Sequence, residues 1–129
     1  MANQFVVQLK NEPGSMATLA EALAARGVDL RAIGGGGIGD AGHVIMTTAD
    51  DDTTKAILDE GGYTYIEGES ILTEVDDRPG GMAALSRQLA DAGVNIYGHL
   101  FLGRWGDRAM FAFVVDDPVT ARPILERKG

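Results

Sequence analysis

The sequence has no cysteine, and this absence excludes disulfides, thiol catalysis and thiolate metal sites. It also agrees with a reducing cytoplasm, where disulfides are rare. No apolar run approaches the length of a transmembrane helix, and residues 1–5 lack the charged region of a secretory signal. We therefore expect a soluble cytoplasmic protein with no membrane partner.

Basic residues are also few. The eleven lysines and arginines are scattered, nineteen acids outnumber them, and the net charge is −8. No basic stripe is present that could follow a phosphate backbone, so we expect no nucleic acid partner. The 129 residues, of which 45% are hydrophobic, fit one compact unit or two very small units that share a core.

The chain contains an internal duplication. Residues 11–16 recur sixty-six positions later as residues 77–82, and each copy leads into a leucine-rich helical pattern that ends at a glycine. An ungapped alignment of residues 13–28 with residues 79–94 gives nine identities in sixteen positions. We therefore predict two related units, residues 1–68 and residues 69–129.

Hydrophobic periodicity predicts one order of elements in both units: strand, helix, strand, strand, helix, strand. The segments of the first unit are 4–10, 15–26, 28–33, 43–49, 53–60 and 63–67, with a turn at 34–40. Those of the second unit are 70–76, 80–92, 94–103, 108–115 and a helix opened by Asp117 and Pro118, with a turn at 104–107. The predicted fold class is α+β: two ferredoxin-like βαββαβ units in tandem, each an antiparallel sheet with helices on one face.

The second unit is predicted to lack its last strand. That absence would leave strand 70–76 with an unpaired edge, which we expect another subunit or a partner to cover. Strands 94–103 and 108–115 also carry apolar residues on both faces, although helices cover only one. We therefore expect sheet-to-sheet packing between the halves or between subunits, and a homodimer or higher oligomer.

The duplicated Pro-Gly turn predicts a function of its own. Proline followed by glycine ahead of a helix leaves the first N–H groups and the positive end of the helix dipole open to an anion such as a carboxylate. The alternative is an ordinary strand-to-helix turn that Ser15 caps. Two copies in register favour a ligand site at the junction of the related halves.

The repeated run Pro-Gly-x-Met-x-x-Leu-x-x-x-Leu-Ala-x-x-Gly-Val-(Asp/Asn)-(Leu/Ile) resembles the ACT domain. This domain is the small-molecule regulatory module attached to many enzymes of amino-acid metabolism. The resemblance covers both halves and nearly the whole chain. In similar ACT proteins, two units pair through their second strands, and an amino acid binds at that seam.

The resemblance implies candidate ligand-binding residues in both halves. Those of the loop and helix start after the first strand are Asn11, Glu12, Gly14, Ser15 and Met16, with Asp77, Arg78, Gly80, Gly81 and Met82 in the second half. Those at the start of the second strand are Asp29, Leu30, Asn95 and Ile96. Pseudo-twofold pairing would set Asn11 against Asn95 in a neutral site and Asp77 against Asp29 in a doubly acidic one. We expect the neutral site to be the competent one.

Other patterns have simpler interpretations. The string Gly34-x-Gly36-x-x-Gly39 matches a dinucleotide fingerprint, but a strand follows it instead of a helix. The glycine run either keeps space open for a ligand or forms a hairpin. The acids at 50–52 suit a helix start better than a metal site.

The sequence therefore predicts a tandem ACT-type sensor that binds an amino acid or small carboxylate, without catalytic residues, cofactor or metal. A partner enzyme is expected to respond to it. One alternative is a regulatory subunit that acts by protein contact alone. Another is a metal-dependent enzyme of the vicinal-oxygen-chelate type with His43, His99, Glu67 and Glu74 as ligands, although the helix expected after the third strand argues against that topology.

Overall fold

The structure is a computed structural model that describes residues 3–126. The chain divides into two compact units, Met1–Gly68 and Glu69–Gly129. No helix within the described residues is long and apolar enough to cross a membrane.

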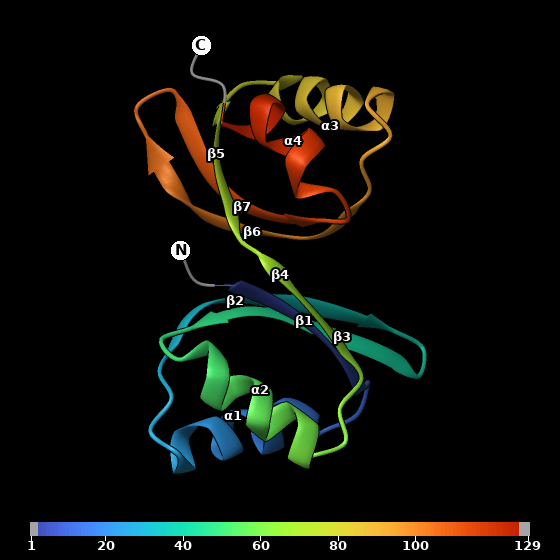
Figure 1. The fold of residues 1–129 in the computed structure, drawn as a ribbon, viewed down its shortest axis with the longest axis vertical. Helices are drawn as coiled ribbons and strands as arrows, with labels where there is room; N and C mark the ends of the chain where they lie inside the picture. Colours follow the sequence, from blue (N-terminus) through green and yellow to red (C-terminus); the bar gives the residue numbers. More distant parts are fainter. Residues whose placement is uncertain (1–2, 127–129) are drawn as a thin grey trace. The chain divides into compact units, whose positions relative to one another are not determined.

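The first unit contains four strands and two helices. In chain order they are β1 (Asn3–Lys10), α1 (Ser15–Ala25), β2 (Leu30–Ile38), β3 (Ala41–Thr48), α2 (Asp51–Glu60) and β4 (Tyr65–Glu69). The strands form one sheet in the order β2-β3-β1-β4, with α1 and α2 on one face (Figure 1). The first strand is therefore central and the second lies at an edge, as the predicted fold requires.

The second unit repeats this order with three strands. Its elements are β5 (Ile71–Asp76), α3 (Gly81–Asp91), β6 (Ile96–Trp105), β7 (Arg108–Val115) and α4 (Pro118–Leu125). The sheet order is β5-β7-β6, and α3 and α4 cover one face (Figure 1). Within residues 3–126 no strand pairs with the free side of β5, so the predicted α+β fold with a shortened second unit is confirmed.

Each unit has its own hydrophobic core between sheet and helices. In the first unit, Leu19 and Leu23 of α1 are buried against Phe5 and Val7 of β1. The spacing of four residues places both leucines on one face of the helix. In the second unit, Leu85 and Leu89 occupy the same positions of α3, in a core that includes Phe113.

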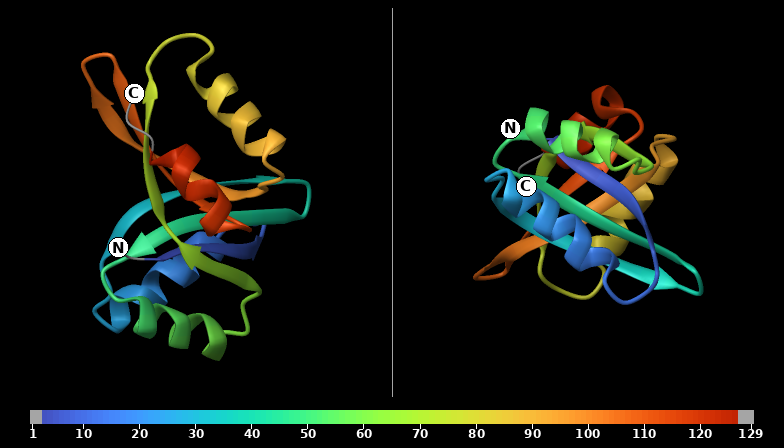
Figure 2. Two further views of the ribbon diagram at one scale, coloured as in Figure 1. Left: turned by 45° about the horizontal axis from the view of Figure 1, so that its top comes forward. Right: turned by 90° about the horizontal axis from the view of Figure 1, so that it is seen from below.

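The glycine run of the first unit is a strand instead of the predicted turn. Residues 34–37 continue β2 and pair with β3, Gly34 opposite Ile45 and Gly37 opposite Gly42. Ladder hydrogen bonds use only backbone groups, so the absence of side chains does not prevent pairing. The turn shrinks to Gly39 and Asp40. The predicted turn at 104–107 is also shorter in the structure, at Gly106 and Asp107, because β6 continues through Trp105. Figure 2 shows both long hairpins, β2–β3 in cyan and β6–β7 in orange.

The registers of the two sheets reveal a one-residue insertion in the second unit. Lys10 pairs with Ala41, and Asp76 pairs with Arg108, so the offset between the copies is sixty-seven residues at this hairpin. The β6–β7 ladder has an irregularity between Phe101 and Gly103, where Leu102 is the additional residue. Beyond this bulge, Arg104 is the counterpart of Gly37, whereas Phe101 before it corresponds to Gly35.

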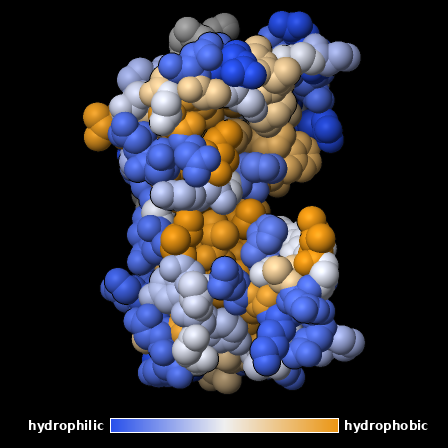
Figure 3. All heavy atoms as spheres, turned by 90° about the vertical axis from the view of Figure 1, so that its right-hand side faces the viewer, coloured by the Kyte–Doolittle hydropathy of each residue, from blue (hydrophilic) through white to orange (hydrophobic). Residues whose placement is uncertain are grey.

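Strand β6 exposes large hydrophobic side chains. The exposed fractions are 48% for Tyr97, 50% for Phe101, 39% for Leu102 and 60% for Trp105. Hydrophobic residues, orange in Figure 3, reach the protein surface among hydrophilic ones. A cluster of this kind on an edge strand is typical of a surface that contacts another molecule.

Candidate ligand site

The helices α1 and α3 begin without a side-chain cap. Gly14 and Gly80 stand at their N-cap positions, both with φ of 91°, and neither helix receives a side-chain cap hydrogen bond. In contrast, Asp50 and Asp117 cap α2 and α4 by accepting the Thr53 and Thr120 N–H groups. Ser15 therefore does not cap α1, and the alternative interpretation of the Pro-Gly turn was wrong on this point.

The first turn of α1 has two amides that remain available. Ser15 N–H donates to Glu12 O at 3.4 Å and Thr18 N–H donates to Gly14 O at 2.9 Å. Within the part of the chain that the structure describes, the Met16 and Ala17 N–H groups have no acceptor. Adjacent free N–H groups at the positive end of a helix suit a carboxylate.

The first turn of α3 has the same arrangement. Gly81 N–H donates to Arg78 O at 3.1 Å, and Ala84 N–H donates to Gly80 O at 2.9 Å. The N–H groups of Met82 and Ala83 have no acceptor among residues 3–126. The duplication has therefore preserved the free amides in both units.

In the first unit these amides adjoin a hollow of about 380 Å³. Its walls include the predicted residues Asn11, Glu12, Ser15 and Met16 on one side and residues 33–37 of β2 on the other. The volume lies within the usual range for small-molecule sites. Glycines at 35 and 37 form a floor without side chains. A Cβ at Gly35 would clash with His43 O and one at Gly37 would lie 2.6 Å from Asn11 Oδ1, so neither position has room for a side chain.

Asn11 is fixed beside the hollow. Its Nδ2 donates to Gly39 O at 2.9 Å, and its backbone N–H donates to Asp40 O at 3.1 Å. A Cβ at Gly37 would lie 2.6 Å from Asn11 Oδ1, so the amide can occupy this place only beside a glycine. Since no donor from residues 3–126 reaches Oδ1, this oxygen can accept a hydrogen bond from a ligand.

The equivalent hollow of the second unit, about 320 Å³, contains an arginine at its floor. Arg104 Nε donates to Asp77 Oδ2 at 2.8 Å. The Arg104 guanidinium lies 4.8 Å from the centre of the Phe101 ring, which meets Phe111 edge-on at 5.5 Å. Asp77 therefore has an internal partner, and the charge that the sequence predicted for this site is offset. Sequence analysis missed Arg104 because the sixty-six-residue offset of the repeat, continued to this hairpin, would set Gly103 against Gly37.

The sequence matches no protein-family model and no curated protein. Among solved structures, protein BT0572 from Bacteroides thetaiotaomicron has a TM-score of 0.71 at 19% identity, over 97% of this chain and 86% of that chain. The ligand-free regulatory subunit of aspartate kinase from Thermus thermophilus has a TM-score of 0.61 at 19% identity, over 97% and 87% of the two chains. The corresponding subunit from Thermus flavus gives 0.64 at 17% identity, over 98% and 92%. The chain has a tandem ACT-like fold. At these identities the similarity concerns the fold alone.

Within each ACT-like unit, the second-strand candidates lie away from the hollow. Asp29 and Leu30 are at the start of β2, whereas the hollow lies near its end. Leu30 packs against the core, and Asp29 forms an exposed ion pair with Arg31 at 3.4 Å. The predicted pairing of these residues across the two halves stays a prediction.

The second unit has the same separation between second-strand candidates and hollow. Ile96 packs against the core of its unit. Asn95 N–H donates to Asp116 Oδ1 at 2.8 Å, and Asn95 O accepts the Asp116 N–H at 3.0 Å. Both bonds use backbone groups of Asn95 and hold the start of β6, so the ligand-binding role of its side chain stays a prediction.

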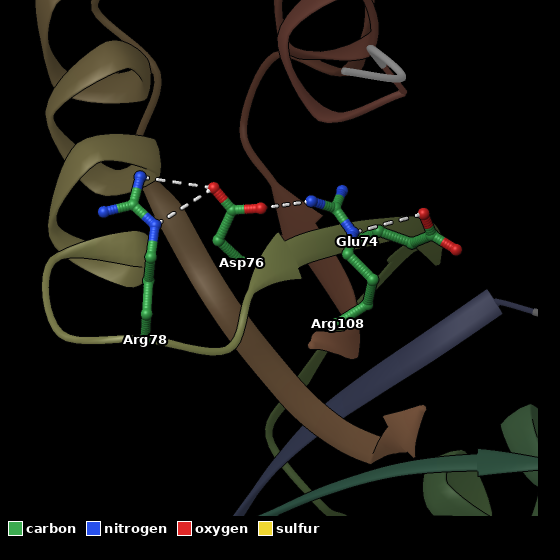
Figure 4. Close-up of polar contacts among 4 residues, drawn as sticks. All are labelled: Glu74, Asp76, Arg78 and Arg108. Carbon is green, nitrogen blue, oxygen red and sulfur yellow. Dashed lines mark hydrogen bonds and ion pairs between the residues drawn. The ribbon is translucent and has the colours of Figure 1, made fainter. Parts of the chain in front are cut away.

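Arg78 takes part in a charged network on β5 (Figure 4). Arg78 Nη2 lies 3.3 Å from Asp76 Oδ2, and Asp76 also pairs with Arg108. Arg108 Nε lies 3.7 Å from Glu74 Oε2. This predicted site residue is therefore engaged with an acid of its own unit, unlike Glu12 at the equivalent position of the first unit.

No group of three or more His, Asp or Glu side chains suited to a metal ion occurs among residues 3–126. The candidates of the metal-enzyme alternative, His43, His99, Glu67 and Glu74, thus form no such group. Helix α2 follows the third strand, as expected, and a helix in this place argues against the topology of that enzyme type.

Proposed function

We propose that this chain is a cytoplasmic regulatory protein without catalytic activity, which binds an amino acid or a similar small carboxylate in the hollow of the first unit. The observation that carries the proposal is the uncapped start of α1 beside that hollow. Aspartates cap α2 and α4, so the uncapped start is specific to the helices that follow the Pro-Gly turns, α1 and α3.

The residues around the hollow match the groups of an amino acid. The carboxylate accepts from the Met16 and Ala17 N–H groups, where the helix dipole also favours negative charge. The ammonium donates to Asn11 Oδ1, and the Glu12 carboxylate supplies a negative charge nearby. The ligand side chain lies along the glycine floor.

The similar structures support a regulatory role in amino-acid metabolism. Two of them are regulatory subunits of aspartate kinase, and we propose that this chain likewise acts on an enzyme partner. A ligand regulates such a partner only if it binds two states of the assembly with different affinity. The measurable consequence is a change in partner affinity when the ligand is added.

The exposed hydrophobic residues of β6 favour a second candidate function. In this case the protein regulates its partner by contact alone, and β6 forms part of a homodimer or of the partner interface. Light scattering at several protein concentrations measures self-association. Substitution of Tyr97 and Trp105 by serine is expected to shift any dimer toward monomer.

A thermal-shift screen tests the leading proposal. Each of the twenty amino acids is added singly at saturating concentration, and at least one is expected to raise the melting midpoint by mass action. The Gly37→Ala variant is expected to weaken this response, whereas Ile38→Ala, an exposed residue of β2 outside the hollow, keeps it. A chain that responds to none of the twenty overturns the proposal and leaves the contact-only function.

A further inference from the structure

The two hollows differ at one decisive position. Gly37 pairs with Gly42 in the first sheet, and Arg104 pairs with Ala109 in the second, each one ladder pair before the hairpin turn. Gly37 lies beside Asn11, the loop residue after β1, and Arg104 lies beside Asp77, the loop residue after β5. The duplicated chain therefore has a bare backbone at this place in one unit and a long cationic side chain in the other.

Arg104 makes the contact that a ligand would make. In the first unit, Asn11 Oδ1 is an acceptor without a donor from residues 3–126. In the second unit, the corresponding acceptor is Asp77 Oδ2, and Arg104 Nε donates to it at 2.8 Å. A guanidinium and an ammonium are both cationic donors, so Arg104 supplies from within the chain what a bound amino acid would supply.

An aromatic stack fixes the arginine in this position. Its guanidinium lies 4.8 Å from the centre of the Phe101 ring, within the range of a cation–π interaction. Phe101 in turn packs edge-on against Phe111. Phe101 stands at the position of Gly35, so an aromatic ring supports Arg104 where the first unit has a glycine.

We infer that Arg104 occupies the ligand position of its own unit, so that each chain binds one amino acid, in the first unit. The inference rests on the proposed function, because it assigns the ligand of that function to one of two duplicated sites. Arg104 is thus the residue that determines which unit is competent.

Isothermal titration calorimetry of the full chain tests this inference, with each of the twenty amino acids titrated in turn. The wild type is expected to bind one equivalent per chain, and Gly37→Ala is expected to weaken that binding about tenfold or more. Arg104→Gly, which copies position 37, is expected to bind two equivalents. The double variant D77N/R104G, which copies the Asn11 and Gly37 pair, is expected to do the same. Arg87→Ala removes an exposed arginine of α3 and is expected to keep one equivalent.

The outcomes separate the inference from the proposed function. Two equivalents in the wild type, or one equivalent whose affinity Gly37→Ala leaves unchanged, overturns the inference and leaves amino-acid binding in place. One equivalent in both Arg104 variants also overturns it, provided that their circular dichroism matches the wild type. Absence of heat with every amino acid, in all variants, overturns the proposed function and the inference together.

Discussion

Asn11 and Gly37 are in direct contact near the β2–β3 hairpin turn, where a Cβ on Gly37 would lie 2.6 Å from Asn11 Oδ1. The Asn11 side chain can donate to Gly39 O only because Gly37 has no side chain. This contact connects the loop before α1 to the hairpin of β2 and β3, and it positions the oxygen that the proposed ligand would contact.

Substitution Gly37→Ala is expected to displace Asn11 and weaken ligand binding about tenfold or more, since a hydrogen bond to a charged group contributes about 1.5–3 kcal/mol. The control is Ile38→Ala, because this neighbouring residue of β2 is 89% exposed and does not line the hollow, so affinity should be unchanged. Titration calorimetry of both variants measures the difference. Equal affinities would contradict the assigned role of Asn11.

Gly14 and Gly80 are expected to be intolerant of substitution although each has space around it. Both have φ of 91°, where an L side chain is strained, and neither Cβ would meet an atom within 4 Å. Gly14→Ala and Gly80→Ala should each lower the free energy of unfolding by about 1–2 kcal/mol, the usual cost of a left-handed residue with a Cβ. Urea denaturation checks this, and an unchanged midpoint for both variants would refute it.

The caps of α2 and α4 predict a loss of stability in acid. Hydrogen bonds from Thr53 lower the pKa of Asp50, and those from Thr120 lower the pKa of Asp117. Because each pKa is lower in the folded state, the stabilisation is present above the unfolded value and is lost as pH falls below about 4. Asn at position 50 keeps a cap acceptor without a charge, so the melting midpoint of Asp50→Asn should depend less on pH in this range. Identical pH profiles for wild type and variant would contradict the assignment.

Tyr65 predicts the opposite pH dependence, a loss of folding stability as pH rises. Its hydroxyl donates to Asp59 Oδ1 at 2.6 Å, and this bond raises the pKa of Tyr65 to about 12. A pKa raised in the folded state means that the stabilisation is complete below about 10 and is lost as pH rises toward the folded value. Phenolate absorbance of the wild type minus that of Tyr65→Phe should show one group that titrates near 12. A difference curve centred near 10 would show that the bond is absent in solution.

The order of elements could be predicted from the sequence because each segment has a clear hydrophobic period. Leu19 and Leu23 recur at helical spacing, and Phe5 and Val7 at strand spacing, and all four are buried as that pattern indicates. The uncapped helix start also follows from local sequence, since Pro-Gly offers no side-chain acceptor for the first N–H groups. These features depend on neighbours in the chain.

The floor of the site depended on contacts between distant residues and could not be predicted. Glycines 34–37 have weak strand propensity, but β3 supplies a partner for their backbone groups. Arg104 became the counterpart of Gly37 only through the bulge at Leu102, which lies outside the aligned repeat of residues 79–94. The ladder register was needed to show it.

The most direct test of the central claim is a nuclear magnetic resonance titration of the ¹⁵N-labelled chain with the amino acid that raises the melting midpoint most. Binding at the start of α1 predicts that the amide signals of Met16 and Ala17 shift most, together with those of the glycines at 35 and 37. Largest shifts at the start of α2, where Asp50 already accepts the Thr53 N–H, or no shift at Met16 and Ala17, would contradict the claim.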